Sequence, residues 1–483
     1  MDFRCLLGQH SWDGCKCEKC GKVNEALIRR MEAKFTKGVF NRSEFLKNGI
    51  LDLSMVHFDD FSFLKKFRGL SKLRISFNKL EDISFIQELK SLTELNLSCN
   101  NISDISSLRK LKRIRVLNLG SNKITDISPI KDFEMLTVLN LSGNKITDFS
   151  FLNRFRGLTE LNLGFNELKD ISFLKELTGI TNLNLEFIPL TDVSFLQNFE
   201  KLEHLSLNQT GICDFSFLKS ITGLTELSIS SNKLTNIDYL KEFKMLTKLD
   251  LGYNKIADYS FLKELSKLEK LSLNANGVSD ASFLKEQSDL VYLDLSYNSL
   301  TELSFLRKFK KLKFLNLSHN QLNDVSFLAD LPNLEKLKLG SNELTNVDFL
   351  KELKALNEID VGDNRITDIP LWLPALKEDS KRIIFYLNFD NQRVPVNSNA
   401  QKCFQLGVNL REDGDWIEAA KFIKQAAEMG HAEAQFNFAL MCMRGDGVRR
   451  SESEGLIWMQ KAANNGLQPA KKNVEILKKT GHI

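Results

Sequence analysis

The sequence predicts an α/β solenoid with a parallel sheet on its concave side, followed by a small all-α module. Two observations predict this architecture. An apolar pattern recurs every 22 residues, and Leu136–Gly157, LTVLNLSGNKITDFSFLNRFRG, is a representative copy. Toward the carboxyl end the period becomes 36 residues, because Ala426-Ala427-Glu-Met-Gly430 returns as Ala462-Ala463-Asn-Asn-Gly466. Internal periods of about 20 to 50 residues are typical of solenoids and repeat arrays.

Fifteen copies of the shorter repeat occupy residues 48–377, with the form L-x-x-L-x-L-x-x-N-x-ϕ-x-D-ϕ-S-F-L-x-x-ϕ-x-x, where ϕ is apolar. The alternation of Leu139 and Leu141 with polar residues predicts a short strand with one face inward. The copies begin at Asn48, Leu70, Leu92, Ile114, Leu136, Leu158, Ile180, Leu202, Leu224, Leu246, Leu268, Leu290, Leu312, Leu334 and Leu356.

Polar residues at fixed positions of each copy predict how its turns close. Asn144 is the ninth residue of its copy, where an amide can donate to and accept from neighbouring backbone. Asp148 and Ser150 precede the pair Phe151-Leu152, and short polar side chains there fit the start of a short helix or 3₁₀ turn. Stacked copies would share a core of Leu and Phe, which agrees with 35 Phe against 6 Tyr and 4 Trp.

This pattern resembles the leucine-rich repeat family, in particular the 22-residue class of internalins and of the protein-phosphatase-1 regulator. The resemblance implies an arc whose concave face is a parallel sheet. It also implies that the chain binds a partner protein, or that it is a regulatory subunit or a bacterial effector controlling a partner enzyme.

Recognition by such an array is expected at the outward third, fifth, seventh and eighth residues of each copy. Exposed aromatic residues there, with polar neighbours, are typical of protein-binding surfaces. Phe165 and Phe187 are eighth residues of adjacent copies and should lie side by side. The alternative is neutral drift on a solvated face. A second predicted group spans four copies, with flanking lysines, and comprises Tyr253, Tyr292, Tyr297, Phe314, His319, Lys248, Lys270 and Lys336.

The ninth-position Asn is replaced in two adjacent interior copies by Ile188 and Thr210, with Pro189 and Gly211 following. Two interpretations stay open at this point. The break is either a local change of curvature or a kink fitted to a partner.

Residues 1–24 contain five soft metal ligands in a short span. Two thiolates separated by two residues can bind one tetrahedral zinc ion around a tight turn. The segment resembles small bacterial zinc-ribbon-like modules, although Gln9 is one residue more than their pattern has. We therefore expect structural zinc here; the alternative is a reduced tail with incidental cysteines. The expected ligands are Cys5, His10, Cys17 and Cys20, with Cys15 as an alternate.

The regions flanking the array have their own patterns. Residues 25–47 predict an amphipathic helical cap, and 378–399 a last strand, within Arg382–Phe389, followed by a linker at Asn397–Asn399. Residues 400–483 resemble the Sel-one-like repeats, antiparallel helix pairs related to TPR repeats. Their core is expected to include Trp416, Phe422 and Trp458. This module is either a second docking surface or only a cap.

Composition limits the function further. The net charge is +4, from 66 basic and 62 acidic side chains, which gives no global reason for nucleic-acid or membrane binding. We find no signal peptide, no apolar run of about 20 residues and no catalytic motif. The prediction is therefore a monomeric, cytoplasmic, non-enzymatic scaffold for protein–protein interaction. Nucleic-acid binding through the zinc segment is a weaker alternative, and a cysteine-dependent ligase using Cys403 or Cys442 is weaker still.

Overall fold

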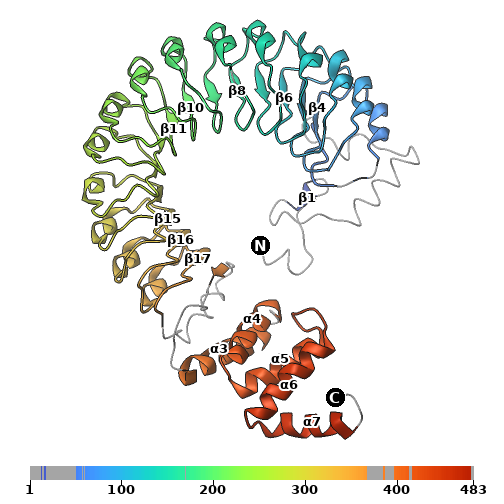
Figure 1. Cartoon of the computed structure of the whole chain (residues 1–483), viewed down its shortest axis with the longest axis vertical. Helices are drawn as coiled ribbons and strands as arrows, with labels where there is room; N and C mark the ends of the chain where they lie inside the picture. Colours follow the sequence, from blue (N-terminus) through green and yellow to red (C-terminus); the bar gives the residue numbers. More distant parts are fainter. Residues whose placement is uncertain are drawn as a thin grey trace. The chain divides into compact units, whose positions relative to one another are not determined.

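The protein is represented by a computed structural model (Figure 1), which divides into unit 1, Met1–Asn298, and unit 2, Ser299–Ile483. The predicted cap over residues 25–47 lies outside the described residues. The structure describes residues 12–13, 16–17, 50–56, 58, 60–168, 170–366, 384–386, 396–412 and 416–479.

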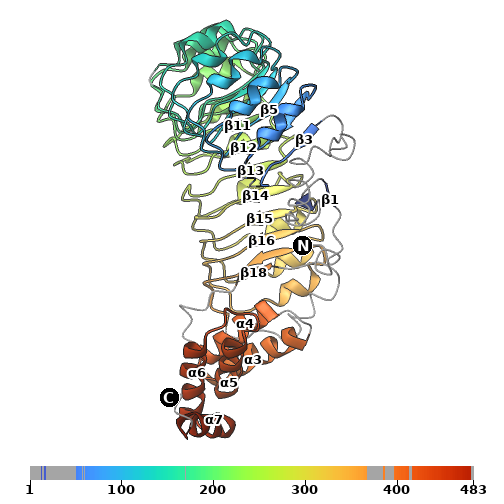
Figure 2. The same ribbon diagram turned by 90° about the vertical axis from the view of Figure 1, so that its right-hand side faces the viewer.

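Every copy of the 22-residue repeat contributes one three-residue strand, as predicted. In unit 1 the strands β3 to β14 pair in chain order and in parallel, with register shifts of one copy such as Val138↔Glu160. In unit 2 the strands β15 to β17 do the same, and β18 also pairs in parallel with β17, with Glu358↔Ile384 in register. Figure 2 shows β11 to β14 following one another along the sheet.

The strands are β3 (Ile50–Asp52), β4 (Lys72–Arg74), β5 (Glu94–Asn96), β6 (Val116–Asn118), β7 (Val138–Asn140), β8 (Glu160–Asn162), β9 (Asn182–Asn184), β10 (His204–Ser206), β11 (Glu226–Ser228), β12 (Lys248–Asp250), β13 (Lys270–Ser272), β14 (Tyr292–Asp294), β15 (Phe314–Asn316), β16 (Lys336–Lys338), β17 (Glu358–Asp360) and β18 (Ile384–Tyr386). A separate antiparallel pair consists of β1 (Trp12–Asp13) and β2 (Lys16–Cys17).

The return segments form 3₁₀ helices, which lie outside the strands of unit 1 in Figure 1. The predicted polar start is seen one residue early: Asp148 Oδ1 accepts the Ser150 backbone amide at 2.9 Å, while the N-cap residue is Phe149, whose side chain makes no cap bond. The helices are η2 (Ser62–Lys66), η3 (Ser84–Glu88), η4 (Ser106–Lys110), η5 (Ser128–Ile130), η6 (Ser150–Arg154), η7 (Ser172–Glu176), η8 (Ser194–Asn198), η9 (Ser216–Ser220), η10 (Asp238–Glu242), η11 (Ser260–Glu264), η12 (Ser282–Leu284), η13 (Ser304–Lys308), η14 (Ser326–Asp330) and η15 (Asp348–Glu352).

The core lies between strands and 3₁₀ helices. Leu139 and Leu141 of β7 and its extension are buried, and so are Phe149 and Phe155 of the return segment. Aromatic side chains also join adjacent copies, since Phe149 stacks on Phe173 with ring centroids 6.0 Å apart. One copy could not bury these groups alone, so neighbouring copies stabilise each other.

A buried Asn at the ninth position ties each regular copy to the one before it. Asn144 Nδ2 donates to the carbonyls of Leu141 (3.0 Å) and Ser142 (3.2 Å) in its own copy. It also donates to the Leu119 carbonyl of the preceding copy (3.0 Å), and its Oδ1 accepts the Ile124 amide (3.0 Å). The predicted role of this amide is confirmed.

The amide pattern is interrupted at Ile188 and Thr210, both fully buried. Ile188 has no side-chain amide and so makes none of the hydrogen bonds of Asn144. In a regular copy the backbone N–H of the tenth residue also bonds the preceding copy, as Lys145 does with the Ile124 carbonyl. Pro189 stands at this tenth position and has no N–H, so this bond is lost as well. Thr210 replaces one bond only, because its hydroxyl donates to the Leu207 carbonyl at 3.1 Å. Whether the interruption fits a partner stays a prediction.

The carboxyl-terminal helices belong to unit 2. Residues Asn397–Asn399, predicted to be a linker, instead lie inside α3, because the helix begins earlier than the Ala-rich pattern indicates. The helices are α3 (Val396–Glu412), α4 (Trp416–Glu428), α5 (Ala432–Arg444), α6 (Glu452–Asn464) and α7 (Gln468–Lys479).

Small residues allow these helices to pack closely, as predicted. Ala426 and Ala462 are fully buried, and Phe438 meets Trp458 edge to face with centroids 5.7 Å apart. The prediction of a core position for Trp416 is wrong: it is 42% exposed, because it is the first residue of α4 and precedes the packed turns.

We expect Asn144→Ala to lower the free energy of unfolding by roughly 2 to 4 kcal/mol, because four backbone groups lose their partner in the core. Asn140→Ala is the control: its Oδ1 accepts only from Ser142, in a half-buried position, so the expected loss is about 1 kcal/mol or less. Urea titration of both variants measures the difference. Equal losses would contradict the central role of the ninth position.

The aspartates before the 3₁₀ helices predict acid sensitivity. The backbone amide and then the hydroxyl of Ser172 donate to Asp170, and they hold the pKa of its carboxyl below the ordinary 3.8. Other copies show the same direction at Asp60, Asp148, Asp192, Asp214, Asp258, Asp280 and Asp324.

A lowered pKa in the folded state contributes stability that is present above pH 3.8 and is lost as the pH falls through the folded pKa. The urea midpoint should therefore be steady at neutral pH and fall steeply below about pH 4. Asp170→Asn should be less stable than wild type at pH 7 and closer to it at pH 3. A difference in urea midpoint between the two proteins that stays constant from pH 7 to pH 3 would contradict the prediction.

Candidate functional site

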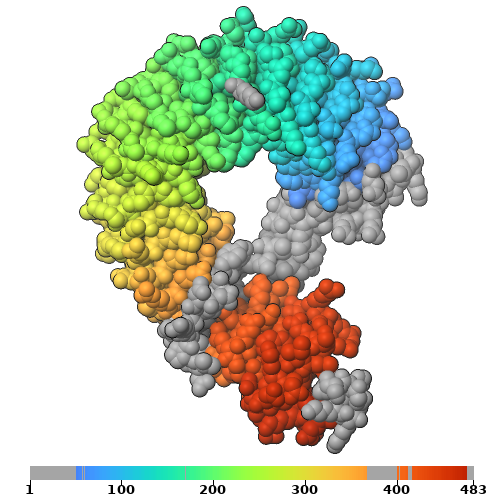
Figure 3. All heavy atoms as spheres, in the orientation of Figure 1, coloured from blue at the N-terminus to red at the C-terminus, as the bar shows by residue number. Residues whose placement is uncertain are grey.

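A groove runs along the strand face of unit 1, which is hollowed in the space-filling view (Figure 3). Its volume is about 680 Å³, and third and fifth residues of the copies from β4 to β12 line it. The side chains at these positions point out of the sheet, because the residue between them, such as Leu139, points into the core.

The polar residues of this groove are largely paired with one another. Lys72 contacts Glu94 at 2.6 Å, and Lys248 contacts Glu226 at 3.2 Å. The lining contains five carboxylates and three Lys or Arg side chains. This balance supplies no positive surface for a phosphate backbone.

A row of fifth-position asparagines has a structural role in the same groove. In Asn118, Asn140 and Asn162 the Oδ1 atom accepts the backbone amide two residues later, at 2.9 to 3.1 Å. Half of each amide group therefore closes the turn at the end of its strand. The Nδ2 donors face the groove and have no acceptor among the residues that the structure describes.

The eighth residue of each copy, which we call the corner residue, adopts a left-handed backbone conformation. All fifteen have φ between 51° and 62°, yet only Gly143 is a glycine. The backbone amides of the corner residues from Met55 to Ala275, and of His319 and Ser341, donate to a carbonyl of the next copy; for example, Tyr253 N donates to the Asn274 carbonyl at 2.7 Å. The sheet thus imposes this conformation on every copy, whatever the side chain.

Five corner residues are aromatic and exposed: Phe77 (51%), Phe165 (48%), Phe187 (40%), Tyr253 (53%) and Tyr297 (52%). A left-handed conformation costs about 1 to 2 kcal/mol for a residue with a side chain, and it is a genuine outlier for a bulky one. Burial does not offset this cost, since half of each ring faces solvent. All fifteen corner residues share this conformation, so the exposed aromatic side chain is what sets these five apart.

The predicted side-by-side arrangement of Phe165 and Phe187 is confirmed. Their rings stack with centroids 4.1 Å apart and planes inclined by 18°. Their role in binding stays a prediction. The sequence-based search missed Phe77, although the same rule identifies it, because it is the eighth residue of the second copy.

Part of the second predicted group lies in unit 1. Lys248, Lys270 and Tyr292 are neighbours in register on β12, β13 and β14. Tyr292 is half-buried, and burial, with Asp294 and Asp250 adding to it, raises its pKa to about 12. Tyr253 and Tyr297 are corner residues of the copies that hold β12 and β14.

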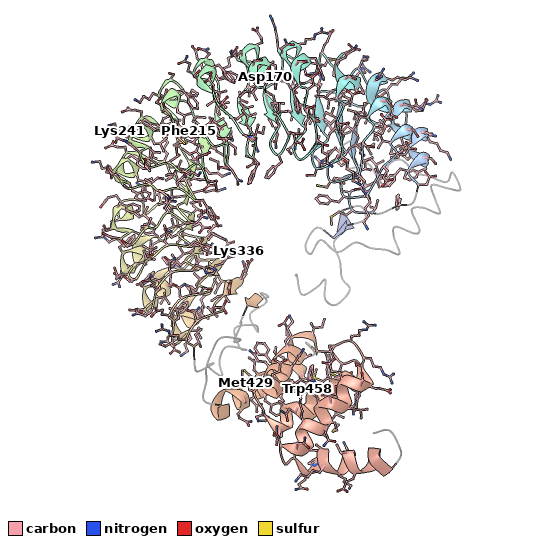
Figure 4. The ribbon with its side chains drawn as sticks, in the orientation of Figure 1. Asp170, Phe215, Lys241, Lys336, Met429 and Trp458 are labelled. Carbon is pink, nitrogen blue, oxygen red and sulfur yellow. The ribbon has the colours of Figure 1, made fainter. Side chains whose placement is uncertain are left out.

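The remaining members lie in unit 2. Phe314 on β15 is half-buried and is in register with Lys336 on β16. Lys336, labelled in Figure 4, contacts Glu358 at 2.7 Å. His319 is an exposed corner residue. By contrast, Asp170 and Lys241 lie on the outer side of unit 1 in Figure 4, away from the strands.

The predicted zinc ligands lie outside the described side chains. The backbone of Cys17 belongs to β2, while Cys5, His10, Cys15 and Cys20 fall among residues that are not described. Within the described residues no group of three or more His, Cys, Asp or Glu is arranged to hold a metal ion. The zinc site therefore stays a prediction.

Cys403 and Cys442 are poorly suited to act as nucleophiles. Both are buried, and burial raises the pKa of each thiol to about 11. At neutral pH they are therefore protonated and inaccessible, whereas a nucleophilic cysteine needs an accessible thiolate.

The helical module of unit 2 contains a second, smaller groove of about 450 Å³. Lys461 Nζ lies 3.9 Å from the centre of the Trp458 ring in this groove, and Asn465 Nδ2 donates to Gln435 Oε1 at 2.8 Å. Figure 4 shows Trp458 among the helices of the module.

Among the helices that the structure describes, none has the length and apolar character of a membrane-spanning segment.

Comparisons with known proteins agree with this geometry. The model of the family "Leucine Rich repeats (2 copies)" matches residues 90–132, 134–176, 244–286, 288–330 and 332–375. The Sel1 repeat model matches residues 400–431 and 432–467. A search of the curated proteins finds no match.

Several solved structures are similar to this chain, among them the following two. An internalin (inlF) from Listeria monocytogenes is 31% identical, with a TM-score of 0.51, over 63% of this chain and 89% of that one. A leucine-rich repeat protein from Leptospira interrogans is 24% identical, with a TM-score of 0.51, over 71% of this chain and 98% of that one, and supports the fold alone.

Fold and repeat pattern together define a class of repeat proteins that is typically used for binding other proteins. The chain belongs to the leucine-rich repeat family, and Sel1 repeats form its carboxyl-terminal helices.

We expect Tyr253→Gly to leave the free energy of unfolding unchanged or to raise it by up to about 1 kcal/mol, because glycine adopts the left-handed conformation without strain. Phe215→Ala is the control: that ring is fully buried, and its loss should cost about 3 to 5 kcal/mol. Urea titration measures both. A loss above about 2 kcal/mol for Tyr253→Gly would mean that the ring serves packing.

Proposed function

We propose that the protein is a non-enzymatic scaffold that binds a partner protein on the strand face of its leucine-rich repeats. The main support for this proposal is the set of five aromatic corner residues, whose side chains are exposed and whose backbone is left-handed. Aromatic side chains with a polar rim are the usual centres of binding energy in protein interfaces. The Trp458 groove of the Sel1 repeats is proposed as a second docking surface.

The alternative function is control of a partner enzyme, as a regulatory subunit or effector. It uses the same surface and rests on resemblance to the phosphatase-1 regulator. Nucleic-acid binding through the amino-terminal segment is a weaker candidate, and the strand groove adds no basic surface to it, since the groove carries more carboxylates than basic groups. A monomeric state and a cytoplasmic location stay predictions.

Structural zinc in residues 1–24 is a separate proposal. Its support is chemical: Cys5, His10, Cys17 and Cys20 supply three thiolates and one imidazole, which suits tetrahedral zinc. A four-ligand site has no open position, so the metal would stabilise the segment without serving a reaction.

Affinity isolation tests the scaffold function. Wild-type chain and a variant with Tyr253, Tyr297 and Phe314 changed to Ala are used to capture proteins from the same extract. We expect the specific partners to be lost from the variant, while Lys241→Ala on the outer side retains them. Recovery of the same partners in the same yield with the triple variant would rule out this surface.

Metal analysis of the purified full chain tests the zinc proposal. We expect about one equivalent of zinc, and loss of that zinc in a Cys17→Ser, Cys20→Ser variant. Less than about half an equivalent in the wild type contradicts the proposal.

A further inference from the structure

We infer that Tyr253, Ala275 and Tyr297 form a slot for a proline-rich segment in the polyproline II conformation. This inference rests on the proposed function and specifies the partner's chemistry. The three residues are the corner residues of three consecutive copies, and the middle one has the smallest side chain.

The width of the slot is inferred from the spacing of two stacked corner rings in the same unit. Phe165 and Phe187, one copy apart and with φ of 57° and 56°, stack at 4.1 Å. Tyr253 and Tyr297 have φ of 54° and 56° and are two copies apart. We take the Tyr253 and Tyr297 rings to project as this pair does; two copies of 4.1 Å then place them roughly 8 Å apart, which is room for one ring in van der Waals contact with both.

The floor of the slot offers a hydrogen-bond donor. Asn274, the residue before Ala275, lies against Gly252, where a Cβ atom would come within 2.0 Å of the Asn274 Oδ1. That Oδ1 accepts the Ser272 hydroxyl at 2.8 Å, while the described residues provide no acceptor for Nδ2. A polyproline II helix leaves all its backbone carbonyls unpaired, so it can accept this bond.

Charge near the slot favours a basic residue beside the proline. Asp250 and Asp294 are the outward fifth residues on the same two copies as Tyr253 and Tyr297. Each carboxylate also closes its own turn, through the amides of Gly252 (3.0 Å) and Ser296 (2.9 Å). An arginine next to the proline would meet negative charge on both sides of the slot.

Other occupants fit the slot less well. An added β-strand needs an open sheet edge, but β12 and β13 are paired on both sides. A nucleic-acid base could stack, but its phosphates would meet Asp250 and Asp294. Proline-rich segments bind grooves lined by aromatic rings, and a single proline ring fits a gap that admits one ring.

The test uses the full chain and a fluorescein-labelled peptide of Pro-Pro-Ala triplets with an arginine at each end. Its control peptide has glycine in place of every proline. We expect saturable binding of the first peptide and at least about tenfold weaker binding of the second, measured by fluorescence anisotropy.

Variants of the chain locate the binding. Ala275→Gln fills the slot and should weaken peptide binding about tenfold or more. It should still fold, because Gln209 stands at the same position of another copy with a φ of 51°. Ser121→Gln, a corner residue outside the slot, is the matched control and should change nothing. Circular dichroism and urea titration check that both variants are folded.

Three results would overturn the inference. These are equal binding of the two peptides, unchanged binding by Ala275→Gln, and tighter binding of a labelled uridine oligonucleotide than of the proline peptide. If the peptide fails while partner capture still depends on Tyr253 and Tyr297, the partner's chemistry is wrong but the scaffold function stands. If partner capture is also insensitive to these residues, the scaffold function falls as well.

Discussion

The buried amide at the ninth position of twelve of the fifteen copies is the interaction on which the regular part of the structure depends. Asn144 shows the pattern: one side chain serves three carbonyls and one amide, and two of these four groups belong to the preceding copy. This bonding supports the turn after the strand in the regular copies, and the same left-handed corner is kept at Phe187 and Gln209, where the Asn is replaced. Because the geometry recurs in every copy, strands stay in register and corner residues fall one above the next.

This constraint separates the residues that build the protein from those available for function. The leucines at the inward strand positions and the ninth-position asparagines are buried and cannot vary freely. The corner residue is held by its backbone alone, so its side chain is free to differ between copies. Gly143, Ser121, Ala275 and Tyr253 all occupy the same conformation. The proposed binding surface therefore consists of a few positions that vary between copies, carried by a scaffold that stays constant.

Much of this could be predicted from the sequence, because spacing alone specifies a repeat. The strand of Leu139, the amide of Asn144, the cap of Asp148 and the stacking of Phe165 on Phe187 all follow from the 22-residue period. The left-handed corner could not be predicted, since only one of its fifteen residues is a glycine.

Other features depend on packing that the period does not encode. Nothing in the pattern marks Trp416 as a helix-start residue facing solvent, or places Asn397 inside α3. The pairing of charges within the groove, such as Lys248 with Glu226, depends on rotamers of exposed side chains. The zinc ligands show the opposite case, because their spacing is informative while their side chains are not described.

The central claim is that binding and stability reside in different residues of each copy. It is tested most directly by measuring partner affinity and the free energy of unfolding in two parallel sets of variants. One set changes the aromatic corner residues to Gly, and the other changes ninth-position Asn residues to Ala. The account predicts weaker binding at unchanged stability in the first set, and lower stability with unchanged affinity of the folded protein in the second. Affinity that merely follows the folded fraction in both sets would contradict it.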